Sequence, residues 1–266
     1  MSIGFIGCGN MAKAIIGGII GSGNFDNKSI YVYDINKDAL KAAETKFGFN
    51  SCISEEEAVK NSDVVILAVK PNVLESVLKK ISSELKNKSA LLISIAAGKN
   101  IGFINNALNN DNRVIRVMPN INATVGKAMS AYTANTFATE ADKALCEKIF
   151  NSIGKTIELE EKHFSVFGAI AGCAPAFSYM YIDSLARAAV KNGMDKKTAL
   201  TVAAQTVLGS AEMILESDAH PWELVDRVCS PGGTTIEGVT SLQKDGFESA
   251  VQNAVDRAIE KDIKLR

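Results

Sequence analysis

The sequence predicts an α/β protein in which a doubly wound parallel sheet is followed by an all-helical domain. Two observations support this fold class. Short β-branched runs alternate with helical patterns through residue 161, which is typical of parallel strands joined by right-handed helical crossovers. From residue 162 on, strand-like runs cease and the remaining segments have helical patterns. We therefore expect two domains, residues 1–161 and residues 162–266.

The elements follow in order along the chain. The strands are predicted at Ile3–Ile6, Ile30–Tyr33, Val64–Val69, Leu91–Ile95 and Val114–Val117, with a last short strand at Thr156–Leu159. The helices between them are predicted at Met11–Ile20, Lys37–Phe47, Ser54–Lys60, Val73–Leu85 and Thr139–Ile153. Ser54 and Glu57 have the spacing of a capping box, and Thr139 is expected to cap its helix. The second domain is expected to form helices at His163–Asn192, Lys196–Ser217, Pro221–Val228, Thr235–Lys244 and Phe247–Lys264.

Composition favours a soluble enzyme of a reducing compartment, here taken as the cytoplasm. The 266 residues are 47% apolar and 22% charged, and 29 lysines and arginines nearly balance 30 aspartates and glutamates. This balance gives no basic surplus for a nucleic-acid partner. The five cysteines lie far apart and form neither a Cys-x-x-Cys pair nor a cluster with zinc spacing, so we expect no metal site.

Two apolar stretches could be mistaken for targeting or membrane segments. Ser2–Ile20 lacks a basic leader and contains Lys13, so we expect mature protein from residue 1. Phe164–Ile182 is nearly as long as the roughly 20 residues that a span requires, but it contains glycines, serines and Pro175. We interpret it as a helix buried in the protein core or between subunits, and we expect no membrane partner.

The first motif lies where the first strand, ending at Ile6, meets the first helix. Gly7-Cys8-Gly9-Asn10-Met11-Ala12 occupies this turn, which is the context of the Rossmann-type dinucleotide fingerprint. Gly7 permits the tight turn, Gly9 lets the backbone approach a pyrophosphate, and Ala12 lets helix and strand pack closely. The alternative is a simple turn between a strand and a helix. We predict that Ile6 and the six motif residues bind a nicotinamide cofactor.

Two further segments lie at carboxyl ends of predicted strands, where open α/β sheets bind ligands. Asp34 follows the second strand, where a carboxylate would bind the ribose hydroxyls of NAD and repel the phosphate of NADP. Asp34 could instead only cap the next helix. Ala68-Val69-Lys70-Pro71 ends a core strand and is predicted to contact the cofactor, with no catalytic role assigned to Lys70.

The second motif is the loop Ser230-Pro231-Gly232-Gly233-Thr234-Thr235 in the helical domain. Two glycines let successive backbone N–H groups converge just before a helix, a geometry that binds anions. Thr234 and Thr235 add hydroxyl donors, although either could be a plain N-cap. We predict that Ser230, Gly232, Gly233, Thr234 and Thr235 hold a substrate carboxylate.

Taken together, these residues resemble the pyrroline-5-carboxylate reductase family along the whole chain. Four motifs of the first domain occur in the order that the family has: Gly7–Ala12, Ala68–Pro71, Ser94–Gly98 and Arg116–Asn120. The most specific motif is the C-terminal signature that follows them: Pro221, Leu224, Val228, Ser230–Ile236, Gly238 and Leu242. One departure is Gly172-Cys173-Ala174-Pro175-Ala176, where the family commonly has Gly-Ser-Gly-Pro-Ala. The replacements are small, so we expect the packing to survive.

The resemblance implies reduction of 1-pyrroline-5-carboxylate to L-proline by hydride transfer from NADPH or NADH, the last step of proline biosynthesis. It implies that Asn120 belongs to the cofactor site and that Thr235 is the catalytic residue, holding the substrate carboxylate. It also implies a helical domain like the C-terminal domain of 6-phosphogluconate dehydrogenase. This domain would interleave to form a homodimer, which could assemble further into a ring of dimers, and helices of two subunits would build each active site.

Two rival functions are weighed against this interpretation. A β-hydroxyacid dehydrogenase of similar build carries a catalytic lysine early in its long helix, but no lysine occurs from Phe164 to Ala186. A nucleotide-binding sensor without turnover would have no use for the Ser230–Thr235 loop. Of the two histidines, His163 and His220, the second precedes Pro221 and is expected to cap or pack there.

Overall fold

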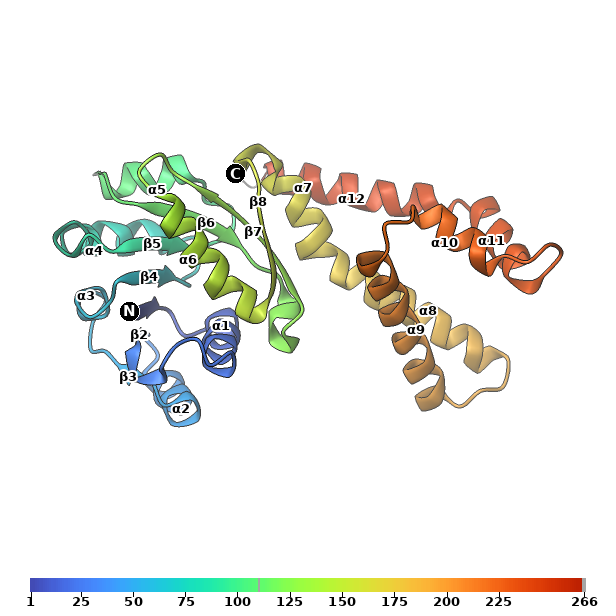
Figure 1. Cartoon of the computed structure of the whole chain (residues 1–266), viewed down its shortest axis with the longest axis horizontal. Helices are drawn as coiled ribbons and strands as arrows, with labels where there is room; N and C mark the ends of the chain where they lie inside the picture. The colour runs from blue at the N-terminus through green and yellow to red at the C-terminus, as the bar shows by residue number, and fades with distance from the viewer. Residues whose placement is uncertain (110, 265–266) are drawn as a thin grey trace. The chain divides into compact units, whose positions relative to one another are not determined.

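The computed structural model describes residues 1–109 and 111–264 (Figure 1). The chain divides into two compact units, and each is described by itself. Unit 1 comprises Met1–Gly172 together with the residues from Ile259 on, and unit 2 comprises Cys173–Ala258. The division falls beyond the boundary expected between residues 161 and 162, so that boundary stays a prediction.

Unit 1 is built on an eight-stranded sheet with the strand order β3-β2-β1-β4-β5-β6-β7-β8. All neighbouring strands are parallel except β6 and β7, which run antiparallel. The order reverses between β1 and β4, which is the topological switch point where doubly wound sheets bind ligands. The strands are β1 (Ile3–Ile6), β2 (Ile30–Tyr33), β3 (Asn50–Ser51), β4 (Val64–Leu67), β5 (Leu91–Ser94), β6 (Val114–Met118), β7 (Ala128–Ala134) and β8 (Gly154–Glu158).

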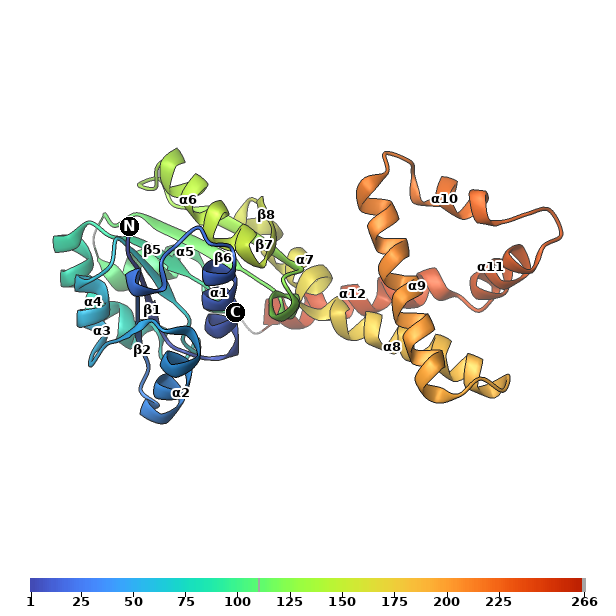
Figure 2. The same cartoon turned by 60° about the horizontal axis from the view of Figure 1, so that its bottom comes forward.

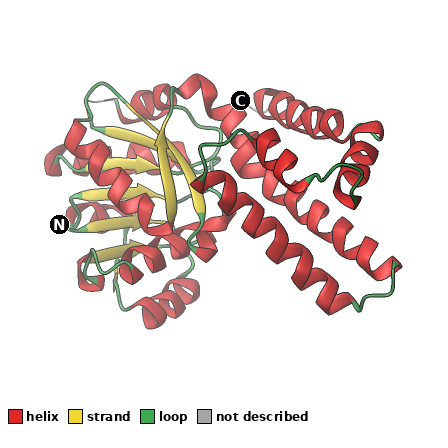
Figure 3. Cartoon of the chain, turned by 45° about the vertical axis from the view of Figure 1, so that its right-hand side comes forward, coloured by secondary structure: helices red, strands yellow, loops and turns green. Residues whose placement is uncertain are grey.

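Helices cover both faces of this sheet, as predicted (Figure 3). One core cluster joins the sheet to α1 (Asn10–Gly21), α2 (Lys37–Phe47) and α6 (Glu140–Phe150). The other joins it to α3 (Glu55–Lys60), α4 (Leu74–Lys88) and α5 (Ile101–Leu108). Short helical turns complete the unit at η1 (Asn27–Ser29), η2 (Ile121–Val125), η3 (Asn151–Ile153) and η4 (Glu161–His163). The α/β fold class is therefore confirmed, with both faces of the sheet buried.

Strand β7 and helix α5 were not predicted. The β7 sequence, Ala128–Ala134, contains three alanines and a serine, residues with weak strand preference, so its pattern was not apparent. Its antiparallel pairing with β6 also makes the sheet mixed rather than wholly parallel. Helix α5 is short and contains Gly102 and two asparagines, which are poor helix formers. Its start is stabilised by the Asn100 side chain, which accepts a hydrogen bond from the Phe103 N–H.

The predicted caps are confirmed by the local hydrogen bonds. Ser54 caps α3 by accepting from the Glu57 N–H, but the predicted capping box is incomplete, because the Glu57 carboxylate accepts from the Ile53 N–H rather than from the Ser54 N–H. Thr139 and Asp142 form a complete capping box at the start of α6. These local contacts explain why the helix starts could be located from sequence alone.

The stretch predicted as one long helix from His163 to Asn192 is interrupted. Helix α7 (Phe164–Phe167) passes into a π-helix at Gly168–Cys173, and α8 (Ala174–Lys191) follows. A π-turn shifts one carbonyl out of the regular helical pattern. The Asn120 side chain donates a hydrogen bond to the Ala171 carbonyl, 2.9 Å away, inside this π-helix. A contact from another element therefore overrides the regular helical pattern.

Unit 2 consists of helices that pack through a small alanine-rich core. Helices α8 and α9 (Lys196–Glu216) pack against each other through Ala186, Ala199 and Ala203 (Figure 2). The unit continues with α10 (Pro221–Val228), α11 (Thr234–Lys244) and α12 (Phe247–Lys264), whose last residues belong to unit 1. The Tyr181 and Phe247 rings lie 6.0 Å apart and join α8 to α12.

Two helical stretches are long and apolar enough to cross a membrane by length and composition. They are Glu161–Lys191 and Lys196–Glu216, and the most apolar windows are 22% and 11% buried. Phe164, Ala169 and Ala171 are buried, whereas the side chains from Gly172 to Ile182 are half-buried or exposed. Within one chain most of this stretch is therefore not buried in a core, and its burial between subunits stays a prediction.

Candidate functional site

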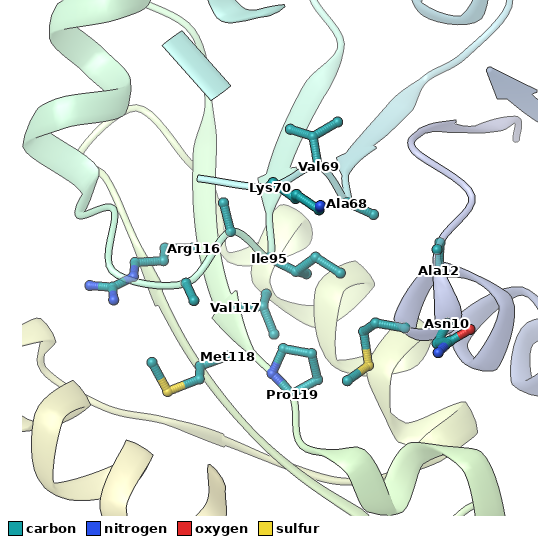
Figure 4. Close-up of a pocket in the computed structure, with 14 residues that line it drawn as sticks. Asn10, Ala12, Ala68, Val69, Lys70, Ile95, Arg116, Val117, Met118 and Pro119 are labelled. Carbon is teal, nitrogen blue, oxygen red and sulfur yellow. The ribbon is translucent and has the colours of Figure 1, made fainter. Parts of the chain in front are cut away.

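A cavity of about 360 Å³ opens at the carboxyl ends of β1, β4, β5 and β6, beside the topological switch point (Figure 4). Seven predicted cofactor residues line it: Gly9, Asn10, Met11, Ala12, Ala68, Val69 and Lys70. Seven others were quoted as motifs but not assigned to the site: Ile95, Ala96, Ala97, Arg116, Val117, Met118 and Pro119. Because they lie at or just after the carboxyl ends of β5 and β6, the strand-end rule that selected Ala68–Pro71 could have found them.

The two glycines of the first motif have different environments. Gly7 has a positive φ of +101°, and a Cβ atom at this position would lie 2.5 Å from the Ala68 carbonyl oxygen. Its N–H donates to the Tyr33 carbonyl, which ties the loop to β2. A Cβ on Gly9 would have no neighbour within 4 Å, because this residue borders the cavity. Gly7 therefore shapes the turn, and Gly9 keeps the backbone open on the cavity side.

The start of α1 has the properties of an anion site. Gly9 is the N-cap residue, so no side chain caps the helix, and no acidic residue lies in the first turn. The first N–H groups of a helix have no partners within the helix and carry a partial positive charge. Asn10, Met11 and Ala12 lie in this first turn, at the cavity wall. This arrangement is the one that the fingerprint predicts, and the binding of a pyrophosphate by these residues stays a prediction.

Asp34 does not cap α2, so the alternative role considered for it is wrong. Asn36 is the cap, and its side chain accepts from the Ala39 N–H. The Asp34 carboxylate instead accepts from the Cys8 N–H at 2.6 Å and from the Asn36 N–H at 2.8 Å. It is thereby held against the glycine loop at the end of β2.

Several predicted cofactor residues do not line the cavity. Ile6 is buried in the core cluster with α3 and α4, and Cys8 is buried on the opposite face of the sheet, so each offers only its backbone. Burial raises the pKa of the Cys8 thiol. Pro71 is exposed and does not line the cavity. Asn120 is buried, with its amide donating to the Ala171 carbonyl and accepting from the Met129 N–H, so its cofactor role stays a prediction.

A buried ion pair supports the cavity wall at the end of β6. The Arg116 guanidinium, whose residue is 2% exposed, lies 2.8 Å from the Glu161 carboxylate and stacks on the Phe164 ring. The same carboxylate oxygen accepts from the Ile101 N–H at the start of α5. Glu161 therefore joins β6, α5 and the segment leading into α7. In Figure 4 the guanidinium points away from Pro119 and Val117.

The second predicted site is the Ser230–Thr235 loop of unit 2. Gly232 has a positive φ of +67°, so the turn needs glycine there. Helix α11 begins at Thr234, and its N-cap is Gly233, with no side-chain cap. Neither threonine is the N-cap, so that alternative is wrong for both. Within the described part of the chain, the Thr235 hydroxyl makes no hydrogen bond.

One detail of the predicted anion loop needs correction. The Gly233 N–H donates to the Ser230 carbonyl at 3.0 Å, closing the turn, so it does not point to a ligand. The free N–H groups are those of the first turn of α11, which begins at Thr234. His220 caps α10 as predicted, because its Nδ1 accepts from the Trp222 N–H.

Comparison with known proteins gives a consistent result for both units. A family profile for pyrroline-5-carboxylate reductase dimerisation matches residues 161–265, and one for NADP oxidoreductase, coenzyme F420-dependent, matches residues 2–98. The chain is 43% identical to pyrroline-5-carboxylate reductase of Escherichia coli strain K12 over 263 residues, covering 99% of this chain and 97% of the relative.

Comparison with solved structures gives the same family as the sequence comparisons. A pyrroline-5-carboxylate reductase from Coxiella burnetii superposes with a TM-score of 0.94 at 32% identity, covering 99% of this chain and 98% of that chain. Plasmodium falciparum pyrroline carboxylate reductase with NADP bound superposes with a TM-score of 0.87 at 36% identity, covering 98% and 97%. The glycine loop, the cavity at the strand ends and the Ser230–Thr235 turn are thus found in a chain that belongs to the pyrroline-5-carboxylate reductase family.

Proposed function

We propose that this protein reduces 1-pyrroline-5-carboxylate to L-proline by hydride transfer from NADH or NADPH, the last step of proline biosynthesis. Two features carry the proposal: a cavity at the strand ends of unit 1 that the glycine loop lines, and a turn in unit 2 that leads into a helix with no side-chain cap. The sequence identity to named reductases over nearly the whole chain supports it. We place the protein in the cytoplasm, which agrees with its unpaired cysteines.

The residues of unit 1 fit a nicotinamide dinucleotide. Gly9 and the uncapped start of α1 would hold the pyrophosphate, and Asp34 would meet the adenosine ribose. The apolar wall formed by Ile95, Val117 and Pro119 would exclude water from the nicotinamide ring. The bound cofactor supplies the hydride, and the protein supplies orientation and shielding.

The loop of unit 2 fits the carboxylate of the substrate. The Thr235 hydroxyl and the first N–H groups of α11 are donors without competing partners among the described residues. A charge-assisted bond from these donors would fix the ring of the cyclic imine. The proposed role of Thr235 is therefore to position substrate.

The ionisable groups that line the cavity are Lys70 and Arg116, and Arg116 is committed to its ion pair with Glu161. The absence of a histidine or carboxylate from this lining suits a substrate that needs no general base in the direction of reduction. A protonated cyclic imine is already electrophilic at carbon, so orientation against the hydride donor suffices. Lys70 is exposed and keeps no assigned catalytic role.

The purified protein is expected to oxidise NADH or NADPH when 1-pyrroline-5-carboxylate is supplied, followed by the loss of nicotinamide absorbance. Proline should appear in equal amount, which chromatography of the product measures. A parallel reaction with β-hydroxy acids and oxidised cofactor tests the rival dehydrogenase activity. If the protein oxidises neither NADH nor NADPH in the presence of 1-pyrroline-5-carboxylate, the proposal is wrong, even if both cofactors bind.

The chain belongs to a family that forms homo-oligomers through its helical domain, and unit 2 has the surface for this. Its α8 and α9 expose many large apolar side chains, among them Tyr179, Met180, Leu200, Val202, Met213 and Leu215. So many exposed large apolar side chains on two helices are unusual for a surface that faces only water, which favours an interface. We propose that unit 2 forms a homodimer and that dimers can assemble further into a ring.

Light scattering should therefore detect no folded monomer at micromolar concentration. A charge on α8 should weaken association because it would be buried without a partner, so Met180→Lys is expected to dissociate on dilution. Met180 is 70% exposed in the single chain. Val125→Lys is the matched control, because Val125 is 72% exposed but lies on η2 of unit 1. A monomeric wild type, or equal effects of the two variants, would contradict an interface on α8.

A further inference from the structure

The carboxyl ends of β2 and β3 carry a group of charges, of which the proposed function gives a role only to Asp34. Asp34 follows β2, and Glu55 and Glu56 begin α3, which directly follows β3. Lys80 of α4 lies 2.7 Å from the Glu55 carboxylate and 3.5 Å from that of Glu56. We call the three carboxylates, Asp34, Glu55 and Glu56, the acidic rim.

The acidic rim lies at the same edge of the sheet as Tyr33, the last residue of β2, because β2 and β3 are parallel neighbours and Asp34 and Glu55 both follow their carboxyl ends. Burial raises the pKa of the Tyr33 hydroxyl, and the charges of Glu55, Asp34 and Glu56 raise it further, whereas Lys80 lowers it. Tyr33 immediately precedes Asp34, whose carboxylate is bonded to the glycine loop. Glu55 thus lies at the same end of the sheet as the carboxylate that would meet the adenosine ribose.

Two features hold carboxylates of the acidic rim in place. The Asp34 carboxylate accepts from two main-chain N–H groups, those of Cys8 and Asn36, so it cannot swing aside without losing both bonds. The Glu55 side chain is 14% exposed and is held by Lys80. The ribose phosphate of NADPH, which bears close to two negative charges, would meet fixed carboxylates here.

The cations near the rim are poorly suited to offset this charge. No arginine occurs before Arg113 in the sequence, so the segments that follow β2 and β3 carry no guanidinium of the kind that commonly receives a ribose phosphate. Lys80 is already paired with two carboxylates. Lys37 lies over the Tyr33 ring, 4.5 Å from its centre, and is the one lysine of α2's first turn that could turn toward a phosphate.

We propose that the enzyme selects NADH over NADPH, and that Glu55, held in place by Lys80, is a second specificity determinant beside Asp34. This inference rests on the proposed function for its meaning but concerns the binding of cofactor alone. The alternative is that Glu55 only stabilises the start of α3, where acidic residues interact favourably with the helix dipole.

The test is calorimetric titration of the unmodified oligomer with NADH and with NADPH in the absence of substrate. Wild type is expected to bind NADH at least roughly tenfold more tightly. Asp34→Asn should shift the affinity ratio toward NADPH by roughly ten- to a hundredfold, and Glu55→Gln by roughly three- to tenfold. Each change removes one charge and keeps the side-chain shape. Glu75→Gln is the control, because Glu75 also pairs with a lysine of α4, Lys79, although its side chain is more exposed, at 55% against 14% for Glu55.

The dependence of the NADH/NADPH affinity ratio on salt concentration is a second measurement, and a purely structural role of Glu55 would not change it. Raising ionic strength screens the repulsion, so the wild-type preference for NADH should weaken between low salt and about 0.5 M salt, and should change little in a variant that carries both Asp34→Asn and Glu55→Gln. Equal affinities, or a preference for NADPH, in wild type would overturn the proposal and indicate Lys37 as a phosphate ligand. An unchanged ratio in Glu55→Gln with a lowered melting temperature would overturn the role of Glu55. Because no turnover is measured, these outcomes are separate from failure of the reductase activity.

Discussion

Replacing Gly7 with alanine is expected to destabilise the fold, whereas the same change at Gly9 is expected to spare the fold and weaken cofactor binding. The two residues are separated by Cys8 alone, but the structure gives them different neighbours. At Gly7 the new methyl group would lie 2.5 Å from a backbone oxygen, at a φ of +101° that side chains disfavour. Backbone strain and overpacking together cost roughly 2–5 kcal/mol.

Gly9 tolerates a methyl group in the protein itself, because its φ is −72° and no atom lies within 4 Å of the added carbon. The loss of stability should stay within about 1 kcal/mol, the usual difference between glycine and alanine at an N-cap. The methyl group would, however, occupy the path by which a pyrophosphate approaches the start of α1. We expect cofactor affinity to fall by roughly ten- to a hundredfold, equivalent to about 1.4–3 kcal/mol of overpacking.

Denaturant titration and cofactor titration on both variants measure these effects. Wild-type cofactor affinity in Gly9→Ala would show that the pyrophosphate does not lie on this loop. Wild-type stability in Gly7→Ala would show that the turn can relax at the Ala68 carbonyl. Both variants retain every ionisable group, so neither result can arise from a change in charge.

Thr235→Val is expected to lower catalytic efficiency without affecting the fold. Valine keeps the shape of threonine and removes one hydroxyl donor. A charge-assisted hydrogen bond to a substrate carboxylate contributes about 1.5–3 kcal/mol, so kcat/KM should fall by roughly ten- to a hundredfold. Melting temperature should be unchanged, because Gly233 is the N-cap of α11 and Thr235 makes no hydrogen bond within the described residues. Cofactor affinity should also be unchanged.

The matched control lies on the same helix. Thr240 donates its hydroxyl hydrogen to the Ile236 or Glu237 carbonyl, so Thr240→Val removes a hydroxyl with only a structural partner. Steady-state kinetics and thermal unfolding of the two variants separate a substrate contact from a helix contact. Wild-type efficiency in Thr235→Val would refute the carboxylate clamp at this residue. The first N–H groups of α11 and the Thr234 hydroxyl would then be the remaining donors.

Much of the fold followed from patterns within short windows of the sequence. Helices α2, α10 and α12 begin and end where they were predicted, because apolar spacing and capping residues act within a few positions. Strand β7 was missed because its burial comes from pairing with β6 and β8, which its own alanines and serine do not indicate. The π-helix was missed because the bond that stabilises it comes from Asn120, far away in the sequence.

The candidate site also has parts that short sequence windows predict and parts that depend on residues far apart in the sequence. The position of the glycine loop at the end of β1, the strand-end segment Ala68–Lys70 and the turn before α11 could be located from sequence, because each depends on a local change from strand or turn to helix. The role of the Glu161 carboxylate, which holds Arg116, could not be predicted from the sequence, since its partners are brought together only by folding.

The sequence by itself determined the class of fold, the family and the two segments suited to anions, because local periodicity, glycine placement and motif order carry that information. Only the tertiary structure decided what individual polar groups do. It assigned Asp34 to the glycine loop rather than to the cap of α2, placed the Asn120 amide against the π-helix, and engaged the Gly233 N–H within its own turn. The physical reason is that a polar group takes whichever partner the packed chain brings within hydrogen-bonding distance, and residues remote in sequence supply many of those partners.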